Sequence, residues 1–350
     1  MLKQPLVLSA GQQQQLQAAD YLNTGIPYWM HKNRILNGDF NIWQRGTALN
    51  TITTTGAYFP DQWQFAFDGT SPSINVQQKA FTVGQTSVPD NPASYCECSV
   101  SLAASGQTFL EMLQRIEGSQ TFQGQYVTIS FWAKADAART LQFQIDRNYG
   151  TGGSPSSTET AIGGVQSFSL STSWQQFTAT IQLTGTSGKT LGTNGNDYLQ
   201  LAFKFPVNSG FTIDIAHVQF EQGQNATAFE YRNVQHELIM CQRYFESFIA
   251  TGSYEFFAQG YQHTTSNARC SLSYAPKRVV PTLLVNNVGN FIVANTTSNY
   301  VCTSIVNGGN TKSAIWLICT VSGTPLITGS GCLLLQNSTN VCSLYLSAEL

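Results

Sequence analysis

Carboxylates and histidines are the side chains that could carry out hydrolysis, and the sequence scatters them. Cleavage of a polysaccharide needs two carboxyl groups roughly 5–10 Å apart across a cleft. No local spacing pairs the acids between Asp39 and Glu230, and the four histidines lie far apart, at positions 31, 217, 236 and 263. The chain has no G-x-S-x-G motif and no parallel β-helix repeat. We therefore expect a protein without a catalytic centre.

A second kind of chemistry, the binding of a sugar, has better support in the sequence. Sugars are held by aromatic rings that stack on their C–H faces, beside amides and charged groups that bind their hydroxyls. If the predicted strands around residues 130, 144 and 202 are neighbours, one polar surface carries Trp132, Lys134, Gln142, Gln144, Asp146, Gln200 and Lys204. We predict a glycan-binding surface there. The alternative is that Trp132 packs under a loop or against another subunit, and Trp43, Trp63, Trp174 and Trp316 are expected in a core or an interface.

The elements that would position these side chains are short strands. In 126–134, Val127, Ile129, Phe131 and Ala133 form an apolar face opposite a polar one. The same alternation recurs in 141–146, 175–181, 199–205 and 211–215. Loops rich in Gly, Ser, Thr and Asn separate these segments, and no long helical pattern lies between them. Residues 34–232 are therefore predicted to form an antiparallel jelly-roll β-sandwich.

One short amphipathic helix is predicted after the sandwich, from about residue 233. Its apolar seam has spacings of three and four residues. The members of the seam are Val234, Leu238, Cys241, Phe245 and Phe248. The helix either packs on the sheet of its own chain or lies at an oligomer axis.

The rest of 233–350 is predicted to be a smaller β-rich domain. Its strands are expected at 282–285, 290–294, 300–305, 314–321, 332–336 and 341–346. In 314–321 both faces are apolar, so this strand must be covered twice. Because about 100 residues give little material for two covers, we expect a neighbouring subunit to supply one. The predicted oligomer interface consists of the helix seam and Trp316.

Composition excludes several classes of partner. Charged residues make up 10% of the chain, against roughly 25% in ordinary soluble proteins, and the formal net charge is -2. Without a run of Lys and Arg, the chain lacks the phosphate-neutralising charge that nucleic acids require. The sequence contains no stretch of 18 apolar residues, the length that would indicate membrane insertion. The eight cysteines have no zinc-site spacing, so we expect reduced, mostly buried thiols.

Residues 1–33 are predicted to form a polar N-terminal arm. The arm has too few apolar residues to make a core of its own, although Leu6, Tyr28 and Trp29 would be costly to expose. We therefore expect it to become ordered by docking onto a partner.

Several short motifs are more specific than the strand pattern, above all NRILNGDFNIWQRG at 33–46. The others are, in order, DQW at 61–63, SFWAK at 130–134, NGNDYL at 194–199, VQFEQG at 218–223, ELIMCQRYF at 237–245 and AEL at 348–350. In these motifs and in their order, the chain resembles a family of phage and prophage tail proteins with a carbohydrate-binding-like domain. LVLSAG at 6–11, with QLQ at 15–17 and Asp20, is similar to the attachment segment of fibre and baseplate proteins.

This resemblance implies a galactose-binding-like jelly roll, a place in the virion and trimeric symmetry. It also implies that the arm binds other tail or baseplate proteins and that the chain is assembled in the host cytoplasm. Related modules often hold a structural calcium ion, and Asp39 and Asp214 match its positions. Ile215 stands where a second acidic residue is usual; otherwise no cofactor is implied.

The expected function is that of a structural protein of a phage tail, a fibre or baseplate component, which recognises a host surface polysaccharide without catalysis. One alternative is a purely architectural joint or decoration protein that binds no glycan. A depolymerase is the second alternative.

Overall fold

The computed structural model describes residues 31–350, apart from 53–54, 70–72, 103–104 and 338–339. Of the preceding residues it describes only two short paired strands, β1 (Leu6–Ser9) and β2 (Gln12–Gln15). The rest of the predicted arm, and with it the expected docking of the arm on a partner, lies outside the described residues.

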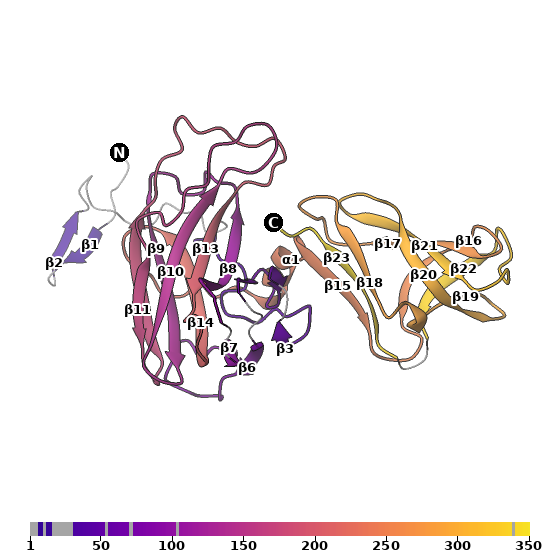
Figure 1. Cartoon of the computed structure of the whole chain (residues 1–350), viewed down its shortest axis with the longest axis horizontal. Helices are drawn as coiled ribbons and strands as arrows, with labels where there is room; N and C mark the ends of the chain where they lie inside the picture. Colours follow the sequence, from indigo (N-terminus) through magenta and orange to yellow (C-terminus); the bar gives the residue numbers. More distant parts are fainter. Residues whose placement is uncertain are drawn as a thin grey trace.

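Two antiparallel sheets of six strands each form a sandwich (Figure 1). The first sheet contains, in spatial order, β11 (Gln166–Leu170), β10 (Arg139–Asn148), β13 (Tyr198–Lys204), β8 (Leu110–Glu117), β5 (Gln64–Phe67) and β4 (Ala57–Tyr58). The second contains β12 (Gln175–Gln182), β9 (Tyr126–Ala135), β14 (Phe211–Gln222), β7 (Ser94–Leu102), β6 (Ser73–Ala80) and β3 (Ala48–Ile52). The predicted all-β sandwich is confirmed.

Aromatic rings from both sheets meet in the core between them. Phe203 of the first sheet contacts Phe131 of the second edge-to-face, with ring centroids 4.9 Å apart, and lies 5.5 Å from Phe143 of its own sheet. All three rings are buried. The residues predicted to face inward on β9 are buried as well, because the two-residue period of a strand sends alternate side chains to opposite faces.

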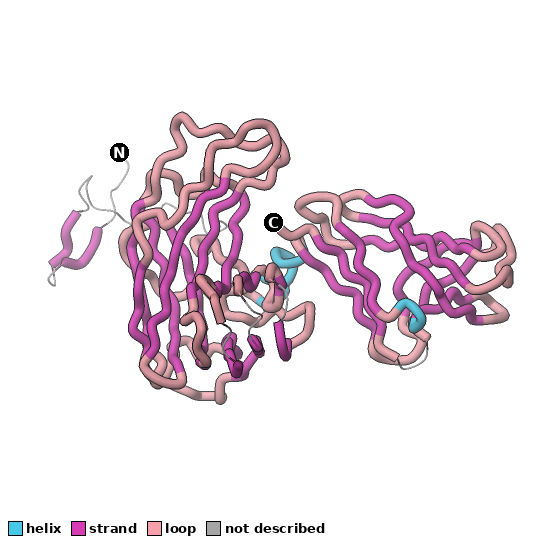
Figure 2. The backbone as a smooth tube through the Cα atoms, in the orientation of Figure 1, coloured by secondary structure: helices cyan, strands magenta, loops and turns pink. Residues whose placement is uncertain are grey.

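The helix and the C-terminal strands follow the sandwich (Figure 2). The helix α1 spans Val234–Gln242, and the Asn233 side chain accepts a hydrogen bond from the Gln235 backbone at its start. A sheet of β15 (Phe245–Ala250), β23 (Cys342–Ser347) and β18 (Thr282–Asn286) comes next. The remaining strands close into a barrel of β16 (Phe256–Gln262), β17 (Asn267–Ser273), β21 (Ala314–Val321), β20 (Asn299–Asn310), β19 (Phe291–Ala294) and β22 (Gly331–Gln336). A 3₁₀ turn, η1 (Val288–Asn290), precedes β19.

The predicted helical seam is wrong beyond Cys241. Phe245 and Phe248 belong to β15, where Phe245 pairs with Ser347 and Phe248 with Leu344 of β23. Phe248 packs against the C-terminal core, whereas Phe245 faces the sandwich, where its ring lies 3.4 Å from the Arg45 guanidinium. The two rings serve different cores, and their spacing of three residues therefore does not mark a helix.

Much of the predicted oligomer interface is buried within the chain. Cys241 and Phe245 are inaccessible, while Val234 is exposed and Leu238 is half-buried. Trp316 is half-buried under the guanidinium of Arg269, 4.4 Å from its ring. A Cβ on Gly309 would come within 2.2 Å of the indole nitrogen, so this glycine makes room for the ring. The outer face of β21 thus receives part of its second cover from its own chain.

All eight cysteines are free and buried, as the sequence predicts. In the described part of the chain, no helix has the length and apolar character that crossing a membrane would require.

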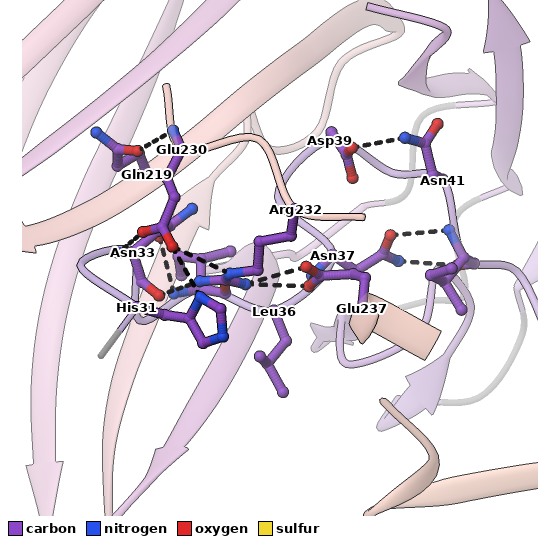
Figure 3. A network of polar contacts seen from close by, with 12 residues as sticks. His31, Asn33, Leu36, Asn37, Asp39, Asn41, Gln219, Glu230, Arg232 and Glu237 are labelled. Atoms are coloured by element: carbon purple, nitrogen blue, oxygen red, sulfur yellow. Dashed lines mark hydrogen bonds and ion pairs between the residues drawn. The ribbon is translucent and has the colours of Figure 1, made fainter. Parts of the chain in front are cut away.

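A buried ion pair joins the loop at 33–46 to the helix (Figure 3). Arg232 Nη1 lies 3.1 Å from Glu237 Oε2, and both side chains are almost fully buried. Arg232 also donates to the carbonyl oxygens of Asn33 and Ile35. Glu237 accepts the backbone N–H of Asn37. The first segment of the sandwich is therefore hydrogen-bonded to the residues on either side of the helix start.

Asn33 and Asn37 of the motif at 33–46 form hydrogen bonds with the backbone. The Asn37 side chain donates to the Ile42 carbonyl at 2.8 Å and accepts the Ile42 N–H at 2.9 Å. Asn33 Oδ1 accepts the N–H of Phe220 at 3.0 Å. A Cβ on Gly38 would lie 2.2 Å from the Val218 carbonyl oxygen, so only glycine permits this approach to β14. The motif is structural.

Replacing Arg232 by methionine should destabilise the protein strongly. The substitution leaves the Glu237 carboxylate buried without its partner, which typically costs about 3–5 kcal/mol. Urea denaturation measures this loss. Lys79→Met is the matched control, because Lys79 and Glu97 form a partly exposed pair 3.3 Å apart, which is worth under about 1 kcal/mol. Equal losses in the two variants would contradict the assigned role of Arg232.

Candidate functional site

A row of polar side chains covers the outer face of the first sheet. These side chains, which we call the amide face, are Gln142, Gln144, Asp146, Gln200 and Lys204. Strand register places Gln142 opposite Lys204 and Asp146 opposite Gln200 on the neighbouring strands β10 and β13. The structure therefore brings these five predicted residues together on one surface.

Hydrogen bonds connect the amide face across the strands. Lys204 Nζ donates to Gln144 Oε1 at 3.2 Å, and Gln144 Nε2 donates to Asp146 Oδ1 at 2.7 Å. Gln200 Nε2 donates to the other Asp146 oxygen at 3.4 Å. Because the amides of Gln144 and Gln200 are held by such hydrogen bonds, their orientation is fixed before any ligand arrives. Such preorganisation lowers the entropic cost of binding.

The C-terminal residues cover one end of this face. Arg115 of β8 donates through Nε to Gln200 at 3.3 Å and through Nη1 to the main-chain oxygen of Leu350 at 2.6 Å. The Tyr58 hydroxyl donates to the same oxygen at 2.9 Å. The guanidinium also lies 4.7 Å from the ring of Tyr198. The β8 end of the face is thus in contact with the chain's own C-terminal residues.

A pocket of about 460 Å³ lies at the β10 and β13 end of the amide face. We call it the edge pocket; it is lined by Thr108, Phe109, Leu110, Ala138, Arg139, Thr140, Gln142, Lys204, Phe205, Pro206 and Val207. Its volume falls within the range of about 300–1,000 Å³ that is usual for small-ligand sites. It joins two residues of the amide face to two aromatic rings, Phe109 and Phe205, and to two threonines, none of which the sequence analysis assigned to a site. Thr108 and Phe109 directly precede β8, and Thr140 lies at the start of β10, where no periodic signal exists.

Trp132 and Lys134 do not share this surface, so their predicted placement beside the other residues is wrong. They lie on β9, which belongs to the second sheet. The chain crosses from one sheet to the other between β9 and β10. The two strands are consecutive in sequence, yet their polar faces point to opposite sides of the sandwich.

Lys134 belongs to a cluster of rings and charges on the second sheet. Its ammonium is 3.1 Å from Asp214 and 5.4 Å from the ring centroid of Trp174. The rings of Phe81, Tyr95 and Trp174 contact one another, with centroids 4.8–5.2 Å apart. Burial, with the negative charges of Asp214 and Glu97, raises the pKa of Tyr95 to about 12. Sequence alternation did not identify this cluster, because Phe81 and Trp174 lie outside the strands.

Asp39 and Asp214, the positions implied for calcium, have different partners. Asp214 is paired with Lys134, whereas Asp39 accepts a hydrogen bond from Asn41 at 2.5 Å and is influenced by the charge of Glu237. Among the described residues, no group of three or more His, Cys, Asp or Glu is arranged to hold a metal ion. The structure gives the implied calcium ion no ligand set in the residues that it describes.

Both carboxyl groups hold their protons more tightly than free aspartate does. Burial, together with the charge of Glu237, raises the pKa of Asp39 from 3.8 to about 6. Burial also raises the pKa of Asp214 to about 6, against the opposing effect of Lys134. A folded-state pKa above the unfolded value means that the native state binds the extra proton between about pH 4 and pH 6, so these groups stabilise the fold as the pH falls through that window.

Asp39→Asn should stabilise the protein at pH 7 and flatten its stability between pH 4 and pH 6. The substitution removes a charge that is costly to bury, and one pKa unit corresponds to about 1.4 kcal/mol, so a gain of about 1–3 kcal/mol is expected. Denaturant titrations at several pH values measure it. Asp68→Asn should have the opposite effect at pH 7, because hydrogen bonds from Thr108 and Phe109 lower the pKa of that exposed carboxyl. A loss of stability in Asp39→Asn at pH 7 would contradict the burial argument.

Comparison with known proteins gives structural likenesses but no family. No family model and no curated protein matches the chain. The match to a CBM4 structure covers 53% of this chain and 98% of the CBM4 chain, with 19% identity and a TM-score of 0.32. A second match is to a family 11 carbohydrate-binding module from Clostridium thermocellum in complex with a β-1,3-1,4-mixed-linked tetrasaccharide. It covers 53% of this chain and 98% of the module, with 13% identity and a TM-score of 0.30.

A phage protein is also among the similar structures. The enzymatically active domain of tailspike protein 4 from bacteriophage CBA120 covers 55% of this chain, with 14% identity and a TM-score of 0.34. This chain spans 22% of that structure. The chain is thus similar in structure to carbohydrate-binding modules and to a tailspike domain.

Proposed function

We propose that this chain is a structural protein of a bacteriophage tail, a fibre or baseplate component, which binds a host-surface glycan on the amide face without catalysis. The resemblance of motifs from 33–46 to 348–350 supports the place in the tail, together with assembly in the host cytoplasm. The preoriented amides of Gln144 and Gln200 support glycan binding. Gln144 accepts a hydrogen bond from Lys204, and Lys204 and Gln142 of the same face line a pocket of suitable size.

The carboxylate of the amide face is poorly placed for acid–base chemistry. Asp146 accepts hydrogen bonds from Gln144, from Gln200 and from the backbone N–H of Ala161. These donors occupy both of its oxygens. This environment favours a binding role over hydrolysis.

An architectural role is the second candidate, and one observation favours it. The contacts of Arg115 and Tyr58 with Leu350 make the β8 end of the amide face part of the joint between the sandwich and the C-terminal strands. A protein that only connects parts of a tail would need this joint and no ligand.

Gln144→Ala and Gln200→Ala should each weaken glycan binding about tenfold. Each substitution removes one oriented amide, and one hydrogen bond is worth about 1–1.5 kcal/mol. A glycan array of host surface polysaccharides, followed by titration of the ligand it identifies, measures the effect. Trp132→Ala is the control, since this ring lies on the other sheet, and it should bind normally.

The outcomes of this array separate the candidates. Loss of binding in Trp132→Ala alone would move the site to the second sheet. Absence of binding to every host polysaccharide would favour the architectural role. Release of reducing ends from host capsule would establish a depolymerase.

We further propose a homotrimer, which the tail resemblance implies. Val234 and Ile239 leave about half of their surface exposed on α1, 48% and 53% respectively, and apolar side chains of one helix suit a contact between copies. Light scattering should give three times the mass of one chain. Ile239→Glu should reduce this mass, and a monomeric mass for the unaltered protein would contradict the trimer.

A further inference from the structure

The edge pocket carries charge of one sign. Its lining contains two cations, Arg139 and Lys204, and no carboxylate. The two come from separate strands, since Arg139 begins β10 and Lys204 ends β13. Two cations that line one small volume from different strands offer charge-assisted hydrogen-bond donors there to an anionic ligand.

Each cation has an acidic partner outside the lining and retains a donor beyond that pair. Lys204 Nζ contacts Glu111 at 3.3 Å and Gln144 at 3.2 Å, and an ammonium group has three donors. Arg139 uses Nε and Nη2 for Asp136, at 3.0 and 2.9 Å, which leaves Nη1. Both partners lie beside the pocket without lining it, so they hold the cations in place and leave capacity for a further anion.

The rest of the lining suits a sugar ring better than a bare ion. Phe109, Pro206 and Val207 supply an apolar wall, and Thr140 and Gln142 add groups that can hydrogen-bond hydroxyls. An inorganic anion would use the cations alone. A pyranose that carries a carboxylate would use the cations, the polar groups and the apolar wall together.

We infer that the edge pocket binds an acidic sugar, a pyranose whose carboxylate is held by Lys204 and Arg139. This inference rests on the proposed glycan-binding function and adds to it the chemical class of one residue of the glycan. The amide face, which continues from Gln142 along β10, would hold the neighbouring sugar residues of the same glycan. The host polysaccharide recognised by the protein is then an acidic one.

Calorimetric titration of the full chain tests this inference. The probes are an oligomer of glucuronic acid, a glucose oligomer of equal length, and inorganic sulfate. The glucuronic acid oligomer should bind at least about tenfold more tightly than the glucose oligomer, since a charge-assisted hydrogen bond is roughly twice as strong as a neutral one. Its affinity should fall as salt rises from about 50 to about 500 mM, because the pocket is open to screening ions.

Three variants locate the effect. Lys204→Gln and Arg139→Gln should each weaken binding of the glucuronic acid oligomer at least about tenfold, with little change for the glucose oligomer. Thr140→Glu leaves both ion pairs intact and should abolish binding of the acidic oligomer by repulsion. Lys134→Gln, a cation on the other sheet, is the matched control and should bind normally. Thermal unfolding of each variant shows whether it is folded.

The results distinguish this inference from the proposed function on which it rests. Equal binding of the two oligomers, unaffected by the three variants, would overturn the acidic-sugar pocket and leave glycan binding on the amide face in place. Sulfate that competes as well as the oligomer would also overturn it, because the site would then be a simple anion site. Absence of binding to any glycan, including those on the array, would overturn both.

Discussion

The fold depends on burying the Arg232–Glu237 ion pair among hydrogen bonds from the surrounding backbone. An ion pair in a protein interior loses its hydration, and it is tolerated only when the surrounding groups replace the lost water contacts. Here the carbonyl oxygens of Asn33 and Ile35 and the N–H of Asn37 provide those contacts. The first loop of the sandwich, the residue that precedes the helix and the helix itself are consequently fixed to one another, which gives the C-terminal strands a defined starting point.

A second group of ion pairs continues this joint. Arg45 lies against the ring of Phe245 and donates to Glu349 at 2.7 Å, while Arg278 donates to the carbonyl oxygens of Ala348 and Glu349. Only 10% of the residues are charged, and these arginines stand at the boundary between the sandwich and the C-terminal strands. The motifs that resemble phage tail proteins, at 33–46, 237–245 and 348–350, meet at this joint. They therefore describe how the chain is built, and the proposed glycan site lies elsewhere.

The two outer faces of the sandwich differ in chemistry. The amide face combines fixed amides with a pocket that carries two cations, whereas the second sheet presents aromatic rings around the Lys134–Asp214 pair. Both faces are polar in sequence, and the first opens onto a pocket of small-ligand size. The β8 end of the amide face is held by the C-terminal residues, so a ligand would lie along β10 and β13.

The sequence by itself determined many of the strands and the inward side of these, because period-two alternation is a local property; it did not identify β3 to β8, β11 or β15 to β17. It located β21 at 314–321 without error, and it selected the five residues of the amide face. It did not determine which sheet a strand joins. β10 pairs with β13, more than fifty residues later, and not with β9, which precedes it in the sequence. Trp132 and Lys134 of β9 therefore lie on the second sheet. Phe245 and Phe248 entered a strand for the same reason, because β23 pairs with them from the other end of the chain. Only the tertiary structure shows which distant segments pair, where the pocket lies and which ion pairs are buried, since no local pattern encodes contacts across such separations.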